Sequence, residues 1–490
     1  MTVFTRQLQW LYAAGAIFLA TICGLALVLK GIFLSIPIAA LLTILFLILG
    51  LLPTPRVLPT RLLRYIFIIY ILTFILWPRY LAIHPAGLPN INLQRIAYIP
   101  LIIIAIASLF WVRPFSDTLK SRLLHNWYAT GLLTLLLFWK VLSIFFSDYV
   151  VVSLYGMIDE IVSYFLVFII SLVVIQDKVD VYRISLVILI GGILAGCIGM
   201  YEAHAGHNVF AGHFPVTAEY VARALFEKSR EGAYRIQSTF EHPLLFAEFL
   251  VFLLPLAFFF GINGKIFIHR VLGWISLPII FYLIFKTGSR AGLGIAVVIG
   301  LFMCIFVFGR KIVVEKLNNV TIIFLLALPL AILMAVAILP DFFERLVFGS
   351  GVTSHSTIAR IIQFKLASPI ILSNPFFGIG PRIAAFSVGY VDAPGGTLTL
   401  DSYFLTIALE SGIPALIVFV LVLTYFIFLG FGSSSKNNSG YFSLANALSF
   451  SLLGILIFKS VLSLPHNFPL IFLAFAMLLV LKEDTTNSNK

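Results

Sequence analysis

Charged residues are scarce in this sequence. Of its 490 residues, 11% are Asp, Glu, Lys or Arg, whereas soluble proteins contain about 25%. Hydrophobic residues make up 61%, and the mean hydropathy is +1.09. Because so few polar side chains cannot cover the surface of a soluble domain, the composition excludes that class and predicts a polytopic integral membrane protein.

Several chemical signatures are also missing. There is no Asp-x-Asp motif, no Gly-rich phosphate loop and no Cys/His cluster with the spacing of metal ligands. The three cysteines, Cys23, Cys197 and Cys304, all fall in apolar runs, which favours packing over a disulfide framework. We therefore expect no cofactor and no metal.

Basic residues exceed acidic ones, and the formal net charge is +12. They are spread over short loops, which disfavours nucleic acid as a partner. The excess fits both anionic lipid headgroups and an anionic substrate, so the positions of the basic residues must decide.

Apolar runs of about 20 residues predict the membrane spans. The expected fold class is all-α, a polytopic bundle of about 12–14 transmembrane helices with a large external loop containing short helices. The expected spans are 8–29, 33–52, 62–77, 97–112, 127–146, 155–175, 181–200, 245–262, 270–287, 290–309, 318–339, 411–431, 442–463 and 467–482. The shorter runs among them, such as 62–77, leave half-spans open.

Two long polar segments divide the chain. We expect N-terminal helices over 1–200, a loop over 201–244, a helical core over 245–340, a large loop over 341–411, and C-terminal helices with a tail over 412–490. The short loops rich in Lys and Arg alternate along the chain in a way that places both termini in the cytoplasm. Both long loops should therefore lie outside.

Two arginines are expected at the external ends of spans, where Lys and Arg are disfavoured in short segments. Arg290 opens a helix after the turn KTGSRAG, and Arg235 lies in YRIQSTFEHP, ahead of Glu241 and His242. A guanidinium group is a bidentate donor suited to phosphate oxygens, and a helix start favours anions. The two residues form a candidate pyrophosphate clamp, and snorkelling to lipid headgroups is the alternative.

The loop 341–411 carries further candidates. The spacing in His355–Leu366 predicts a short helix lying on the membrane surface, with Arg360 and Gln363 on the side opposite its apolar residues. Arg360 is either simply solvated or part of a binding site. Asp401 precedes an apolar run, so it is either a helix N-cap or a general base acting on a sugar hydroxyl. His355 is a second candidate base. Arg360 and Arg382 are further candidates for binding pyrophosphate.

Five charged residues are expected at membrane depth, where such groups are usually paired or line a pathway. We expect Lys140 to pair with Asp159 or Glu160 on the next helix. The five residues are Lys140, Asp159, Glu160, Glu248 and Lys459.

Four strings occur in order in the second half of the chain. They are RIQSTFEHPLLFAEFLVFLLPL (Arg235–Leu256), TGSRAGLGIAVVIGL (Thr287–Leu301), NPFFGIG (Asn374–Gly380) and DSYFLTIALESGIPAL (Asp401–Leu416). Together they make the chain resemble the O-antigen ligase and polysaccharide polymerase family of bacterial envelope proteins. The first 200 residues are similar only in being a run of spans.

The resemblance implies a glycosyltransferase of the bacterial inner membrane. It would take glycans from an undecaprenyl-pyrophosphate carrier on the periplasmic side, without a nucleotide sugar. By position, Arg235 and Arg290 match the family's two arginines that hold the pyrophosphate. The implied partners are the lipid-linked oligosaccharide and membrane lipids, with flippase and chain-length regulator proteins as candidates.

One departure from the family pattern bears on the reaction. Ligases of the family typically carry a histidine followed by Asn or Ser where this chain has Asp401-Ser402. The role of that histidine would then fall to Asp401, with His355 and His242 as alternatives. We therefore expect a polymerase that joins repeat units, by a metal-independent displacement that inverts the anomeric carbon, as in GT-C-like enzymes.

Other functions remain open at this point. A ligase that transfers the glycan to lipid A-core or protein would use the same arginines. A transporter of lipid-linked oligosaccharide would also need them, but the placing of both long loops on one side and the lack of visible inverted repeats favour an enzyme. A scaffold subunit without activity is a third possibility.

Overall fold

The computed structural model describes residues 60–82, 92–211, 229–230, 233–314, 354–391, 398–433 and 442–487. The expected spans 8–29, 33–52 and 318–339 lie outside these residues. The described helices are α3 (Thr60–Leu76), α4 (Leu93–Trp111), α5 (Arg113–His125), α6 (Trp127–Ser143), α7 (Val150–Glu160), α8 (Leu166–Val174), α9 (Lys178–Ala205), α11 (Pro243–Asn263), α12 (Phe267–Lys286), α13 (Arg290–Val314), α16 (Ser354–Ser373), α17 (Ala384–Val388), α18 (Tyr403–Ser433), α19 (Leu444–Phe458) and α20 (Phe468–Asn487).

The predicted all-α polytopic class is confirmed. Within the described ranges, eight helical segments are long and apolar enough to cross a bilayer, and α19 is a shorter apolar helix. The strands found there are β1 (Ser229–Arg230) and β2 (Ala233–Tyr234), which pair antiparallel. Helix bounds follow the expected spans closely, with the largest difference at α18, which begins at Tyr403 instead of 411.

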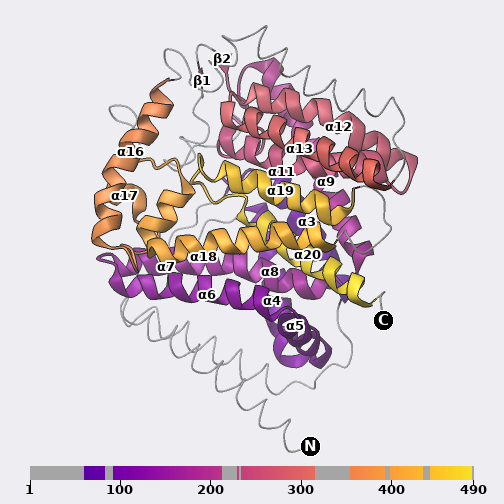
Figure 1. Cartoon of the computed structure of the whole chain (residues 1–490), viewed down its shortest axis with the longest axis horizontal. Helices are drawn as coiled ribbons and strands as arrows, with labels where there is room; N and C mark the ends of the chain where they lie inside the picture. Colours follow the sequence, from indigo (N-terminus) through magenta and orange to yellow (C-terminus); the bar gives the residue numbers. More distant parts are fainter. Residues whose placement is uncertain are drawn as a thin grey trace, which may run out of the picture.

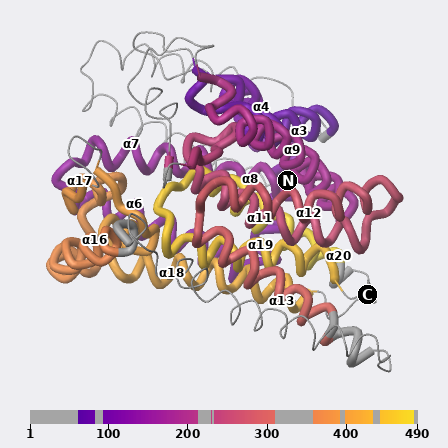
Figure 2. Tube along the Cα trace, turned by 90° about the horizontal axis from the view of Figure 1, so that it is seen from above, coloured from indigo at the N-terminus to yellow at the C-terminus, as the bar shows by residue number. Residues whose placement is uncertain are grey.

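Helix α11 lies in the middle of the bundle (Figure 2). Its most apolar stretch of 18 residues is 89% buried, and it contacts α9, α12, α13 and α19. Apart from Glu248, the side chains buried around α11 are apolar, as expected for a helix with neighbours on every side. At its start, Phe240 packs against Phe246 and Phe249, with ring centroids 5.4 and 5.1 Å apart.

The two ends of the bundle differ in their chemistry (Figure 1). One end holds α5 and the C-terminal part of α20, where Arg122 pairs with Glu483 at 3.3 Å and Arg64 pairs with Asp180 at 2.7 Å. The opposite end holds α16, α17, β1 and β2. The described parts of both long loops therefore lie at the same end, away from the short basic loops.

Cysteine labelling tests which end faces outward. In a background without the native cysteines, Ser229→Cys and Ser373→Cys should react with an impermeant maleimide added to intact cells, because both residues are exposed at the end that carries α16. Ser121→Cys in α5, also exposed, should react only after the membrane is opened. Labelling of Ser121→Cys alone in intact cells would invert this orientation and contradict an external site.

The string NPFFGIG supplies backbone hydrogen-bond donors to carbonyl groups that a kink in α18 leaves without helical partners. Gly412 has φ +82° and Pro414 lacks an N–H group, so the carbonyls of Leu409 and Glu410 lose their helical partners. Ile379 and Gly380 donate backbone N–H groups to these two carbonyls at 2.8 and 3.0 Å. A Cβ on Gly412 would lie 2.2 Å from the carbonyl oxygen of Phe376, so no larger residue fits without a shift.

Candidate functional site

Arg235 lies against the turn that leads into α13. Its Nε donates to the carbonyl of Thr287 at 2.7 Å, and the N–H of Ile236 donates to the carbonyl of Lys286 at 3.3 Å. Gly288 has φ +64°, and a Cβ there would lie 3.1 Å from Arg235 Nε. Glycine at this position therefore allows both the turn and the close approach of the guanidinium group.

Arg290 is the first residue of α13, two residues beyond that glycine. Ser289 Oγ accepts the N–H of Gly292 at 3.0 Å and so caps the helix. Arg290 is half-exposed, while Ser289 is buried. The structure thus brings the two arginines that the sequence singled out to one turn at a helix N-terminus, where the helix dipole favours an anion.

Asp401 faces α16. Its Oδ2 lies 3.6 Å from Arg360 Nε, and its backbone N–H donates to Gln363 Oε1 at 2.9 Å. The side chains of Arg360 and Asp401 are 34% and 32% exposed, so both remain accessible to a substrate group.

The side of this helix that carries Arg360 and Gln363 faces protein, so the alternative that Arg360 is simply solvated is not what the structure shows. Helix α16 has 20 residues, and its apolar residues are the ones that face outward: Ile358, Ile361, Ile362 and Leu366 are each 39–51% exposed. Gln363 is 1% exposed and Arg360 pairs with Asp401. The polar side faces protein because Asp401 supplies its partners, and the apolar side suits hydrocarbon.

Arg382 belongs to another part of the same end. It is exposed, has φ +70°, and packs against Gly156 of α7, whose added Cβ would lie 3.0 Å from the Arg382 Cβ. In Figure 1, α7 lies below α17 and just above α6, whereas β1 and β2 lie at the top of the view. Arg382 therefore does not sit on the turn that holds Arg235 and Arg290.

The remaining candidates lie beside α11 and in α16. His242 Nδ1 accepts the N–H of Leu244 at 3.1 Å, so His242 is the N-cap of α11. Glu241 is half-exposed just before it. His355 falls in the first turn of α16, but its side chain lies outside the described part of the chain.

Four of the five charges expected at membrane depth form two pairs, and Asp159 is exposed. Lys140 Nζ lies 2.5 Å from Glu160 Oε2, which confirms the expected pair and selects Glu160 over Asp159. Lys459 Nζ lies 2.8 Å from Glu248 Oε1, and both side chains are fully buried. The carbonyl of Lys459 accepts the N–H of Tyr403 at 2.9 Å. This second pair therefore links α11 and α19 to the start of α18, two residues after Asp401.

The sequence analysis did not single out three buried residues at this end. Glu202 accepts hydrogen bonds from the segment that carries Arg235. Glu410 is buried beside the backbone N–H groups of Arg382 and Ala384. Burial, reinforced by Arg79 and Lys459, lowers the pKa of His466 well below its usual value, so His466 is neutral at physiological pH. Single polar residues at helix ends carry no periodic signal, which is why the sequence did not reveal them.

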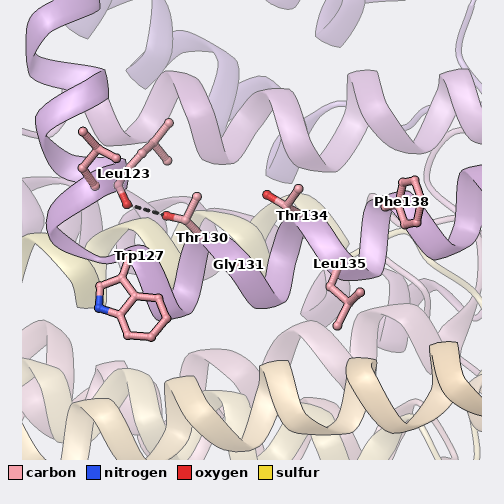
Figure 3. A pocket seen from close by; sticks show the side chains of 8 residues that line it. Leu123, Trp127, Thr130, Gly131, Thr134, Leu135 and Phe138 are labelled. Carbon is pink, nitrogen blue, oxygen red and sulfur yellow. Dashed lines mark hydrogen bonds between the residues drawn. The ribbon is translucent and has the colours of Figure 1, made fainter.

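An apolar groove lies on α5 and α6, away from these residues (Figure 3). Its volume is about 480 Å³, and it is lined by Leu123, Leu124, Trp127, Thr130, Gly131, Thr134, Leu135 and Phe138. No side chain in this lining is ionisable. The groove therefore offers a surface for hydrocarbon and no acid–base chemistry.

Comparison with known proteins identifies one family. Residues 275–420 match the family model described as O-antigen ligase. The matched range is less than a third of the chain, and it includes Arg290, Arg360, Arg382 and Asp401, while Arg235 precedes it. The match confirms the resemblance found in the sequence. A search of curated proteins finds no match to this chain.

Proposed function

We propose that this chain, whose residues 275–420 carry an O-antigen ligase domain, is a polymerase of a surface polysaccharide, an O-antigen or an exopolysaccharide. It joins oligosaccharide repeat units carried on undecaprenyl pyrophosphate at the outer face of the bacterial cytoplasmic membrane. Both termini lie in the cytoplasm. The family assignment implies a membrane enzyme of glycan assembly acting on a lipid-linked glycan, and the polymerase activity, carrier and orientation are our proposals.

The placing of Arg235 and Arg290 on one turn carries this proposal. Arg235 donates to Thr287, and Arg290 begins the helix three residues later. When the bond between the anomeric carbon and the carrier pyrophosphate breaks, negative charge develops on the leaving pyrophosphate. Two guanidinium groups at a helix N-terminus supply preorganised donors for that charge, so these residues, instead of a metal ion, balance it.

Asp401 is the proposed general base. It takes the proton from a hydroxyl of the acceptor sugar while that oxygen attacks the anomeric carbon, and the pyrophosphate leaves with the electron pair of the broken bond. Attack in a single step inverts the anomeric configuration. We assign Arg360 to Asp401 instead of to the pyrophosphate, because Arg360 Nε lies 3.6 Å from Asp401 Oδ2. Gln363 Oε1 accepts the backbone N–H of Asp401 and so stabilises the position of this residue.

The ligase alternative shares the leaving group and differs in the acceptor. The family model itself is described as O-antigen ligase, and the sequence reason for preferring a polymerase is Asp401-Ser402 at the position of the ligase histidine. Flippase and chain-length regulator proteins are proposed partners of either enzyme.

A single-substrate reaction separates the two. Purified full-length protein given only undecaprenyl-pyrophosphate-linked repeat units should produce a ladder of products that grow by one repeat, with release of undecaprenyl pyrophosphate. A ligase needs lipid A-core or a protein acceptor before it reacts. The measurement is gel electrophoresis with mass spectrometry of the products.

The matching genetic experiment uses a deletion strain. Loss of a polymerase should leave single repeats on the carrier or at the cell surface. Accumulation of long polymer on the lipid carrier would show that chain growth does not need this protein, and the ligase assignment would then replace ours.

A further inference from the structure

Glu202, near the C-terminal end of α9, is fully buried. Its Oε1 accepts the Tyr234 hydroxyl at 2.6 Å, and its Oε2 accepts the backbone N–H groups of Gln237 at 3.1 Å and Ser238 at 2.5 Å. These three donors lie on both sides of Arg235 in the sequence. A single carboxylate therefore fastens the whole 234–238 segment to α9.

The carboxylate and the segment depend on each other. A buried charge is stable only when hydrogen bonds replace its lost water, and here one short segment supplies three of them. Ser238 has φ +52°, an unfavourable backbone for a residue other than glycine. Such a strained backbone persists only when surrounding contacts stabilise it. Here Glu202 accepts the Ser238 N–H, and the carbonyl of Ala195 accepts the Ser238 hydroxyl at 2.6 Å.

The same segment sets the position of Arg235. Two residues between those bound by Glu202 contact the turn before α13. The Ile236 N–H donates to the carbonyl of Lys286, and Arg235 Nε donates to the carbonyl of Thr287. A shift of the segment relative to α9 would move the guanidinium group along the turn that leads to Arg290. We propose that Glu202 is a positioning residue, which keeps Arg235 in register with Arg290 so that both bind one pyrophosphate. This inference rests on the pyrophosphate role given to Arg235 above.

Binding of undecaprenyl pyrophosphate to the purified full-length chain in nanodiscs tests the proposal. Glu202→Leu keeps the bulk of the side chain but removes all three acceptor bonds. We expect it to weaken binding about 10-fold or more, because the 234–238 segment is no longer fixed to α9 and Arg235 loses its register with Arg290. Tyr234→Phe removes one bond and should weaken binding about 2- to 5-fold.

The conservative variant should restore binding. In Glu202→Gln, the amide oxygen can accept the two backbone N–H groups, and the amide nitrogen can donate to the Tyr234 hydroxyl oxygen. We therefore expect Glu202→Gln to retain most of the affinity. A side chain that serves only to fill space would not distinguish Gln from Leu in this way.

A double-mutant cycle shows whether Glu202 acts through Arg235. In an Arg235→Lys background, Glu202→Leu and Tyr234→Phe should add little further loss, because residues in one network are not additive. The control is Ile188→Ala, a truncation of a buried residue in the same helix, which should lower the melting temperature without changing affinity.

Two outcomes overturn the inference and are distinguishable. If Arg235→Lys weakens binding but Glu202→Leu and Tyr234→Phe do not, or if their losses simply add to that of Arg235→Lys, Glu202 has no positioning role and the clamp remains. If Arg235→Lys leaves binding unchanged, the pyrophosphate role itself fails and the inference fails with it. Should Glu202→Leu not fold, Tyr234→Phe with its cycle decides between these results.

Discussion

Replacing Asp401 with asparagine is expected to abolish polymer formation while the protein still inserts in the membrane in normal amounts. Asparagine and aspartate cap helices about equally well, and the backbone N–H that donates to Gln363 is retained. The variant therefore removes the proton acceptor and, with it, the negative charge that faces Arg360, while the backbone contact is kept. General base catalysis contributes about 10²- to 10⁴-fold, and we expect a loss of that size in repeat units joined per minute.

The matched control is Asp148→Asn, which removes an exposed carboxylate that follows the C-terminal end of α6 and should leave the rate near that of the unmodified protein. His355→Ala should retain a measurable fraction of activity. An Asp401→Asn protein with full activity would return Asp401 to a purely structural role at the start of α18, and His355 would become the leading candidate for the base.

Lysine in place of Arg290 or Arg235 is the second change with a large expected effect. Lysine keeps the positive charge but offers a point contact where arginine offers two parallel donors. Losing one charge-assisted phosphate contact costs about 1.5–3 kcal/mol, which corresponds to a fall in rate of about 10- to 150-fold. In Arg235→Lys, the bond from Nε to the Thr287 carbonyl is lost as well.

The control for this experiment is Arg183→Lys at the opposite end of the bundle, where the arginine is 59% exposed and lies 3.4 Å from Asp180. It should leave polymer length unchanged. Immunoblots of membrane fractions show whether each variant is present in the same amount. Polymer length is then compared on gels. Near-normal polymer in both Arg235→Lys and Arg290→Lys would refute the pyrophosphate clamp.

Local composition was enough to predict most of the long apolar helices that the structure describes. A membrane helix must satisfy its backbone internally and present apolar side chains over about 20 residues, so the signal is contained in one stretch of sequence. The same logic led to the pairing of Lys140 with a carboxylate on the next helix, since a charge at that depth needs a partner. The choice of Glu160 over Asp159 required the structure.

The protein partners of the polar side of α16 could not be predicted from its own residues. Its spacing shows an apolar side and a polar side, and the usual expectation is that the polar side meets water. The structure instead buries Gln363 and brings Arg360 to Asp401, which lies about 40 residues further along the chain. A helix at a membrane surface can reverse the usual arrangement, because hydrocarbon accepts the apolar side.

The sequence by itself determined the membrane class, the helical fold and the position of most spans. It also gave the short list of arginines and carboxylates that are candidates for binding or catalysis. Each of these follows from residue types within a window of about 20 residues, because hydrocarbon acts on every stretch of chain separately. The tertiary structure alone decided which of those residues meet: Arg235 at the turn before Arg290, Asp401 against α16, and Glu202 beneath the Arg235 segment. These contacts join parts of the chain that are distant in sequence. Helix packing and the need of each buried polar group for a partner select them, and neither is encoded in a local pattern.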